Sequence, residues 1–505
     1  MARQDTSAMP RTYGAWRRQR GYELAGLSLK RFGIVAGCMM IGILLFNAGI
    51  AAVLVWAAIS GLIILYAVIP FGRATLFERT VFHIRGRLMI AAGRASLYGG
   101  PLTSHPRRNR LPGVLSPLVP VAAEDGRGGH QVLVHNRATG FISAIVRVAP
   151  VGITLADRTD ADAWVASYGG FLAELGYKPM VASVAMTVES APTGGATQRD
   201  YVRERMEPHR GSAPGFATAV LDELVSRSAA ATADVTTTVT INFDPSRLRP
   251  EPSTMEEAAA EVVRWLPAME NSLSACGATV IGRAQLGWLI RRVRMAFDPD
   301  ARGEASRQLE VAEADEVLRW QDAGPIRAEE AWRSYRHDSG ISFSWVLDAP
   351  PTGHVQNRIL LPMLSPGRFP RRVSIVYTPM PASVATRKVE EEINAGNVRG
   401  WLASKSKKDE TQRDIEDRRR ALLAAQEEAL GAGVGSFTMY VTTTVSDPRE
   451  LPAAIADVEE RAGQAKLRLR PCHGAQAAGF AASMGLGIDP AAGLKRQGAE
   501  RWQAA

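Results

Sequence analysis

The stretch from Phe32 to Gly72 constrains this chain most, because its forty-one residues include no charged side chain. A helix rises about 1.5 Å per residue and a bilayer's hydrocarbon core is about 30 Å thick, so about twenty residues make one span. The stretch is long enough for two spans, and Asn47 and Gly49 favour a turn between them. We expect a transmembrane helical hairpin (32–72), with helices over 29–46 and 48–68. The alternative is a buried helix pair in a soluble protein.

Basic residues flank this apolar stretch on both sides: Arg17, Arg18, Arg20, Lys30 and Arg31 before it, and Arg73 and Arg79 after it. Basic flanks remain on the cytoplasmic side of a membrane. We therefore expect two spans in the inner or plasma membrane, both termini in the cytoplasm and only the short turn outside. A cleaved signal peptide is not expected, because the apolar stretch begins about thirty residues in and is too long.

The formal net charge of +9 is modest for 505 residues, and much of it lies beside the apolar stretch. Each basic residue there is attracted to anionic lipid by about 1 kcal/mol. Nucleic-acid binding is the alternative explanation, but no basic-aromatic motif accompanies the charge, so we expect no direct contact with nucleic acid. The cysteines, Cys38, Cys276 and Cys472, are isolated, which argues against a disulfide framework or a zinc site.

Composition divides the rest of the chain into segments. Residues 1–31 form a basic cytoplasmic arm, and 73–120 combine an amphipathic helix (74–92) with a linker rich in Pro, Gly and Arg (99–120). Two modules follow, 121–324 and 325–505. The second contains a charged helical arm, 384–430, whose middle (405–420) is typical of a solvated helix or coiled coil rather than of a nucleic-acid contact.

Strands and helices alternate in the first module. β-Branched residues predict strands over 131–135, 141–149, 181–189, 235–243 and 279–282, and helices are expected over 161–175, 198–206, 216–228, 255–275 and 285–297. We expect an α+β fold: the N-terminal hairpin, then two tandem ferredoxin-like α+β modules, each a sheet with helices on one face.

The second module repeats the first at an offset of about 200 residues. The strand ending at Asp244-Pro245 matches the one ending at Asp447-Pro448, and Ala-Gln pairs open a later helix at Gln285 and at Gln476. Asp can cap an incoming helix and Pro suits its first turn, so both Asp-Pro pairs are predicted strand-to-helix turns.

A search for chemistry finds little. The chain has no Gly-Lys pair and therefore no Walker A lysine, and Gly-x-Ser-x-Gly is absent. The glycine cluster 431–435 follows a helix and precedes a strand, which is the wrong order for a phosphate-binding loop. His130 and His135 lie on opposite sides of a strand, and the adjacent Cys472 and His473 are expected to be structural. We predict no catalytic residue, metal ligand or cofactor, and hence no enzyme.

The segment 467–490 (LRLRPCHGAQAAGFAASMGLGIDP) resembles the end of the amino-terminal domain of conjugative type IV secretion ATPases. The family pattern is a Gln, a Phe and a Leu-Pro-Leu-Gly-like turn; here these are Gln476, Phe480 and the turn 484–487, without the proline. In that family the RecA-like motor begins just beyond this point, and we expect this protein to have no motor of its own. The two-span hairpin resembles the inner-membrane subunit that partners, or is fused to, such ATPases.

The whole layout resembles an actinobacterial family of integral membrane proteins linked to conjugation-type secretion. The resemblance implies a non-enzymatic scaffold whose cytoplasmic modules dock a separate secretion ATPase, other secretion subunits or further copies of the chain. Two alternatives remain open. One is a membrane component of type VII secretion, since one of those also joins two spans to a cytoplasmic α/β domain. The other is a membrane-bound enzyme of unknown chemistry.

Overall fold

The computed structural model describes residues 23–24, 27–46, 49–71, 74–93, 95–99, 110–124, 128–152, 156–192, 202, 204–206, 214–231, 233–302, 319–351, 353, 355–381, 384 and 433–490. The described helices within 17–96 belong to one compact unit, and the described residues from 97 onward belong to another. Of the expected segments, almost all of the charged arm 384–430 lies outside the described residues, as do most of the N-terminal arm and residues 100–109 of the linker. Of the expected helix 198–206, only residues 202 and 204–206 are described, and they are helical.

The N-terminal unit contains the expected helical hairpin. Helices α1 (Leu29–Leu45) and α2 (Ile50–Ala67) are followed by α3 (Leu76–Ala91), with short paired strands beside them: β1 (Glu23–Leu24) with β2 (Leu27–Ser28), and β3 (Pro70–Phe71) with β4 (Ala74–Thr75). Among the described residues, α2 is the one helix long and apolar enough to cross a membrane; the apolar part of α1, Arg31–Leu45, is shorter. None of the residues of α2 is buried.

The two helices of the hairpin contact each other through Trp56. Its indole Nε1–H donates to the backbone oxygen of Cys38 over 2.8 Å. Gly42 makes this approach possible, because a Cβ there would lie only 3.3 Å from the indole ring. Small residues let apolar helices approach closely in this way. At the other end of α2, Tyr66 meets Phe77 of α3 edge to face, with the ring centroids 6.1 Å apart.

The second unit is a mixed α+β structure built on one large 13-stranded sheet. Its strands in spatial order are β5 (Ser96–Tyr98), β12 (Arg327–Glu330), β13 (Tyr335–His337), β14 (Gly340–Ala349), β16 (Gly435–Val445), β15 (Arg371–Pro379), β9 (Val181–Pro192), β10 (Ala233–Phe243), β8 (Phe141–Pro150), β7 (His130–Asn136) and β6 (Leu118–Glu124). Outside this path, β11 (Ala278–Arg283) pairs with β8 and β17 (Arg468–Pro471) pairs with β14. From β12 to β6 the pairings are antiparallel.

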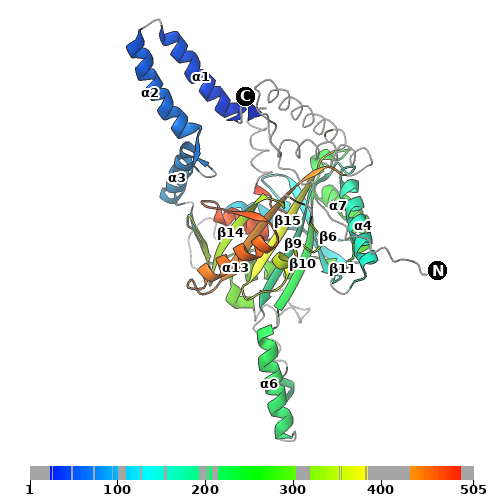
Figure 1. The fold of residues 1–505 in the computed structure, drawn as a ribbon. Coiled ribbons are helices and arrows are strands. Elements are labelled where there is room, and N and C mark those ends of the chain that lie inside the picture. The colour runs from blue at the N-terminus through cyan, green and yellow to red at the C-terminus, as the bar shows by residue number, and fades with distance from the viewer. Residues whose placement is uncertain are drawn as a thin grey trace, which may run out of the picture. The chain divides into compact units, whose positions relative to one another are not determined.

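Strands from both sides of the expected boundary at residue 324 belong to this one sheet. β9 of the first half pairs antiparallel with β15 of the second, in register from Val184 opposite Tyr377 to Ser190 opposite Arg371. Figure 1 shows these two strands side by side between β10 and β14. The halves are therefore continuous through a pair of strands, which we call the junction.

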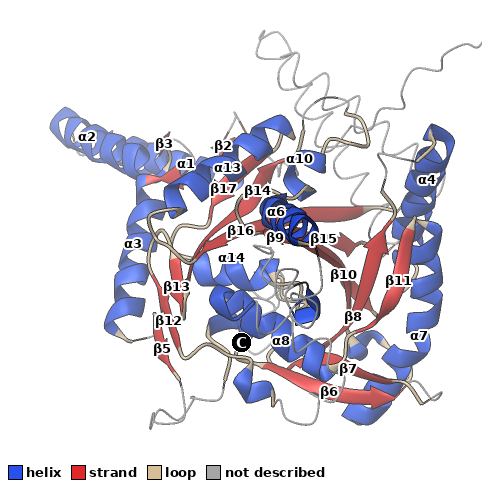
Figure 2. Ribbon diagram, turned by 90° about the horizontal axis from the view of Figure 1, so that it is seen from below, coloured by secondary structure: helices blue, strands red, loops and turns tan. Residues whose placement is uncertain are grey.

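Helices cover both faces of the sheet, whereas one covered face was expected. Figure 2 shows the strands curving around α8 (Leu286–Phe297) and α14 (Gln476–Ser483), with α4 (Arg158–Leu175), α7 (Met255–Ala275), α10 (Leu361–Leu364) and α13 (Leu451–Gln464) on the outer side. Helices α8 and α14 each follow the last strand of their half, and both lie on the face opposite the other four helices. Helix α6 (Gly215–Ala231), by contrast, leaves Phe216 and Leu224 exposed.

Three main clusters of apolar side chains fill these layers. One packs α4 and α7 on β8, β9 and β10, and includes Leu266. The second packs α10 and α13 on β14, β15 and β16, and includes Val458. The third lies around α8 and α14 and also buries Leu111, Leu115 and Leu118, so the second part of the expected linker is packed in the core. That part forms the 3-10 helix η2 (Gly113–Leu115) and the start of β6.

A candidate functional site at the junction

The residues expected to flank the membrane are only partly described. Arg17, Arg18, Arg20 and Arg73, and Asn47 of the turn, lie outside the described residues. Lys30 and Arg31 lie in the first turn of α1, and Arg79 is exposed on α3. Gly49 precedes α2 with a φ of 104°, in the left-handed region that favours glycine. Its conformation suits the end of a turn between the two helices.

The repeated Asp-Pro pairs lie where the sequence placed them, after β10 and β16, but neither Asp caps a long helix. Asp244 precedes the 3-10 helix η4 (Pro245–Arg247) and accepts from Ser246 Oγ at 2.6 Å. The following helix α7 is capped instead by Thr254, whose side chain accepts from the Glu257 amide. Asp447 accepts from the Arg449 amide at 2.8 Å, and α13 begins only at Leu451. The extra residues after each Asp-Pro turn separate it from the helix.

The two repeated glutamines are used differently. Gln476 is fully buried at the start of α14, and its Oε1 accepts from the Ser344 amide of β14 at 2.7 Å. Its Nε2 lies 3.5 Å from the Ser344 oxygen, so the side-chain amide binds the strand as a neighbouring strand would. Gln285 precedes α8, is exposed and makes no capping bond. The sequence match between them therefore does not extend to the side-chain contacts.

The second unit, which we call the body, contains an unexpected group of buried charges at the junction. We call this group the junction cluster: Glu189, Arg292, Arg302 and Arg372. Glu189 of β9 lies directly opposite Arg372 of β15. Its carboxylate accepts from Arg302 Nη2 at 2.6 Å, and Arg292 Nη2 of α8 lies 3.9 Å from its other oxygen. Glu189, Arg292 and Arg372 are each less than 10% exposed.

The electrostatics of the junction cluster follow from its composition. Burial alone would raise the pKa of Glu189, but Arg302, Arg292 and Arg372 lower it to about 2. Burial lowers the pKa of Arg372 to about 10, and it also lowers the pKa of Arg292. A carboxylate held ionised by three guanidinium groups is a poor general base, so the cluster is suited to binding negative charge rather than to transferring protons.

Aromatic rings complete the surroundings of these arginines. The guanidinium of Arg372 lies over the ring of Phe480, 4.5 Å from its centroid, and Arg292 lies over Trp288 at 5.3 Å. Such cation–π contacts are stronger away from water. Phe480 comes from α14 and Trp288 from α8, so one helix of each half contributes to the site.

Hydroxyl and amide side chains extend from this cluster along the same face of the sheet. Thr187 of β9 donates to Ser374 of β15 at 2.9 Å, across the junction. Ser143 donates to Asn242 at 2.7 Å, and Asn242 donates to Ser183 at 2.8 Å. Because each of these buried groups has a partner, the polar layer holds the strands without leaving these groups unsatisfied.

The turn after α14 fits into this polar layer. Thr240 Oγ1 donates to the Gly485 oxygen at 2.6 Å. Gly485 and Gly487 have φ values of 70° and 79°, and a Cβ on either would overlap side chains of the sheet: Thr187 for the first, Ser143 and Asn242 for the second. Both glycines are thus required by backbone conformation and by close approach.

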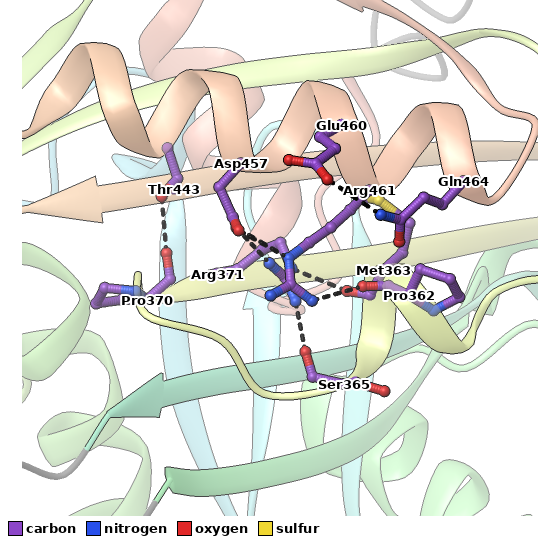
Figure 3. Close-up of polar contacts among 10 residues, drawn as sticks. All are labelled: Pro362, Met363, Ser365, Pro370, Arg371, Thr443, Asp457, Glu460, Arg461 and Gln464. Atoms are coloured by element: carbon purple, nitrogen blue, oxygen red, sulfur yellow. Dashed lines mark hydrogen bonds and ion pairs between the residues drawn. The ribbon is translucent and has the colours of Figure 1, made fainter. Parts of the chain in front are cut away.

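A second arginine cluster lies on the outer face, one residue along β15. Arg371 donates from Nε to the Met363 oxygen at 2.9 Å and from Nη2 to the Ser365 oxygen at 2.6 Å, and its Nη1 lies 3.2 Å from Asp457 of α13 (Figure 3). Arg461 binds the same carboxylate at 3.0 Å and donates to the Pro362 oxygen. These bonds satisfy loop carbonyls around α10, so this cluster fixes the loop before β15.

The side chains considered for chemistry are separate in the fold. Burial raises the pKa of the Cys472 thiol to about 11, which keeps it protonated, and the neighbouring His473 stacks on Trp332. His130 lies 3.8 Å from Glu124, a contact that does not involve His135. No group of three or more His, Cys, Asp or Glu side chains that could hold a metal ion occurs within the described residues.

Sequence reasoning did not find the junction cluster. Arg291, Arg292, Arg371 and Arg372 occur as Arg-Arg pairs, which in a sequence are typical of a surface. The available signal was Glu189, a lone acid at the end of an apolar strand. In comparisons with known proteins, the chain matches no protein-family model and no curated protein.

Proposed function

We propose that this chain is a non-enzymatic structural component of a conjugative, type IV-like secretion system in the inner or plasma membrane. The hairpin α1–α2 anchors it through two spans, with both termini in the cytoplasm. The cytoplasmic body docks a separate secretion ATPase, other secretion subunits or further copies of the chain. The observation that carries the proposal is the unburied apolar surface of α2, together with the resemblance of residues 467–490 to the non-motor domain of the secretion ATPases.

We also propose that each half of the body is a ferredoxin-like unit. Support comes from the strand order: β11-β8-β10-β9 in the first half and β17-β14-β16-β15 in the second. Numbered along the chain, both are fourth-first-third-second, with a helix after the first strand and after the third. The hairpins between second and third strands carry long insertions, 193–232 and 380–434, which we propose as docking elements.

The orientation can be tested with a single cysteine. In Ala48→Cys, the new thiol should react with a membrane-impermeant maleimide added to intact cells, because the turn lies outside. Tyr177→Cys, at a position 69% exposed on the body, should react only after permeabilisation. The unmodified chain gives the background from Cys38, Cys276 and Cys472. Labelling of the Tyr177 variant in intact cells would contradict the proposed topology.

The assignment to a secretion machine is tested by isolating the membrane complex. Solubilised membranes separated on a blue-native gel should show the chain in an assembly, and mass spectrometry should identify a type IV-like motor in the same band. A type VII motor there would favour that alternative instead. ATP hydrolysis by the purified chain at a meaningful rate would contradict the non-enzymatic proposal.

A further inference from the structure

The junction cluster borders a small cavity, of about 20 Å³. Its lining includes Glu189, Arg302 and Arg372 together with the hydroxyl-bearing Thr442 and Thr444 of β16. A cavity of this size admits one water-sized sphere, and so one water or one monatomic ion. This water-accessible space is smaller than phosphate or an organic carboxylate.

The charges of the junction cluster do not balance. Arg292, Arg302 and Arg372 are three cations, and Glu189 is the only carboxylate among the described residues that pairs with them at the junction. Asp234, whose negative charge raises the pKa of Arg292, is exposed. Among the described residues of the junction cluster, two positive charges are therefore in excess. Excess charge buried without a partner is strongly unfavourable.

Arg372 has donor capacity to spare. Its side chain is about 95% buried, with 5% exposed, and its Nη2 has no hydrogen-bond partner among the described residues. Buried polar atoms are normally paired, so an unpaired buried N–H indicates a place where a water or an ion can bind. Its guanidinium lies over the face of Phe480, and Glu189 is the residue opposite it on the neighbouring strand.

We propose that this cavity binds one small monovalent inorganic anion of the size of chloride. The N–H groups of Arg372 and Arg302 hold it, and Thr442 lines the same cavity. The anion reduces the excess of positive charge and adds contacts at the junction between the two halves. Its binding stabilises the folded body, because the unfolded chain has no such site.

The test uses the full-length chain in detergent micelles, exchanged into sodium gluconate, whose anion is too large for the cavity. Sodium chloride then replaces gluconate at constant ionic strength while thermal unfolding is followed. We expect the Tm to rise by about 3–5 °C and to reach a plateau as the site fills. No difference between the two salts would overturn the proposal and leave the cavity to water.

Three variants locate the effect. Arg372→Gln should abolish the chloride-specific rise in Tm, and Arg461→Gln, which removes a partly buried arginine from the outer cluster, should retain it. If Arg372→Gln does not fold, Arg302→Gln, whose side chain is 18% exposed, should reduce the rise at least several-fold. A full chloride response in either junction variant would overturn the assignment. Broadening of the ³⁵Cl NMR signal by the wild-type chain, absent in the junction variant, gives an independent readout.

Discussion

At the scale of residues, the buried histidine of the body shows how one side chain fixes a chain of hydrogen bonds. His337 is fully buried; its Nδ1 lies 2.6 Å from the Phe297 oxygen and its Nε2 lies 2.7 Å from Ser342 Oγ. A carbonyl oxygen can only accept, so Nδ1 carries the proton and Nε2 accepts from Ser342. Ser342 then accepts from Thr444, 2.7 Å away. Both ring nitrogens are therefore satisfied in the neutral form, so the histidine needs no charge in the core.

This arrangement predicts a loss of stability in mild acid. Burial is the main reason that the pKa of His337 is lowered from 6.5 to about 4. The folded state therefore binds fewer protons than the unfolded state between these values, and the free energy of unfolding falls as the pH drops from 6.5 to 4. The contribution is about 3 kcal/mol at 1.36 kcal/mol per pKa unit. Urea unfolding of the full chain at several pH values measures it.

The variant His337→Asn should lose this part of the pH dependence, although it is less stable at neutral pH. Ser342→Ala is the matched control, because it removes the same hydrogen bond and keeps the histidine. Its unfolding should remain sensitive to pH over the same range. An unchanged slope in His337→Asn would contradict the assignment.

The burial of individual charged side chains could not be predicted from the sequence, for a physical reason. The burial of Arg372 depends on its pairing with Glu189, 183 positions away in the chain, and on the face of Phe480. Neither neighbour is visible in the local pattern Arg-Arg-Val-Ser. His337, between Arg336 and Asp338, is likewise hidden in a polar stretch although it lies in the core.

At the scale of elements, local pattern was a good guide wherever burial alternates along one segment. The helices expected over 255–275 and 285–297 are α7 (Met255–Ala275) and α8 (Leu286–Phe297). The strand expected over 141–149 is β8 (Phe141–Pro150). The strand β6 was missed, because its residues Pro120 and Ala122 lack the β-branched signal and follow a Pro- and Arg-rich stretch.

The turn after α14 requires glycine at Gly485 and Gly487. We expect Gly487→Ala to destabilise the chain by about 2–4 kcal/mol, since it combines an unfavourable positive φ with overlap of Ser143 and Asn242. Gly140→Ala is the matched control: its φ is 73° and no atom lies within 4 Å of the added Cβ. It should cost only about 1–2 kcal/mol. Chemical unfolding of both variants measures the difference, and equal losses would contradict close packing of the turn.

At the scale of the whole molecule, the sequence repeat indicated two similar halves but not how they join. Edge-to-edge pairing of β9 with β15 requires only compatible edges, and it leaves no periodic signal in either strand. The core around α8 and α14 mixes residues of both halves, such as Leu289 with Phe480 and Leu486. Such contacts between distant segments are set by tertiary packing, so the expected boundary at residue 324 does not divide the sheet.

The shared sheet and shared core predict that the two halves unfold together. Leu266→Ala empties a fully buried position of α7 in the first half and should destabilise the body by about 2–4 kcal/mol. If β9 and β15 couple the halves, hydrogen exchange should accelerate by the same factor in β10 of the first half and in β16 of the second. Leu224→Ala on α6, at a position 57% exposed, should change neither. Faster exchange confined to the first half would mean that the two halves are independently stable units joined at the junction. In that case a ligand bound at the junction cluster would stabilise the contact between the halves and not either half alone.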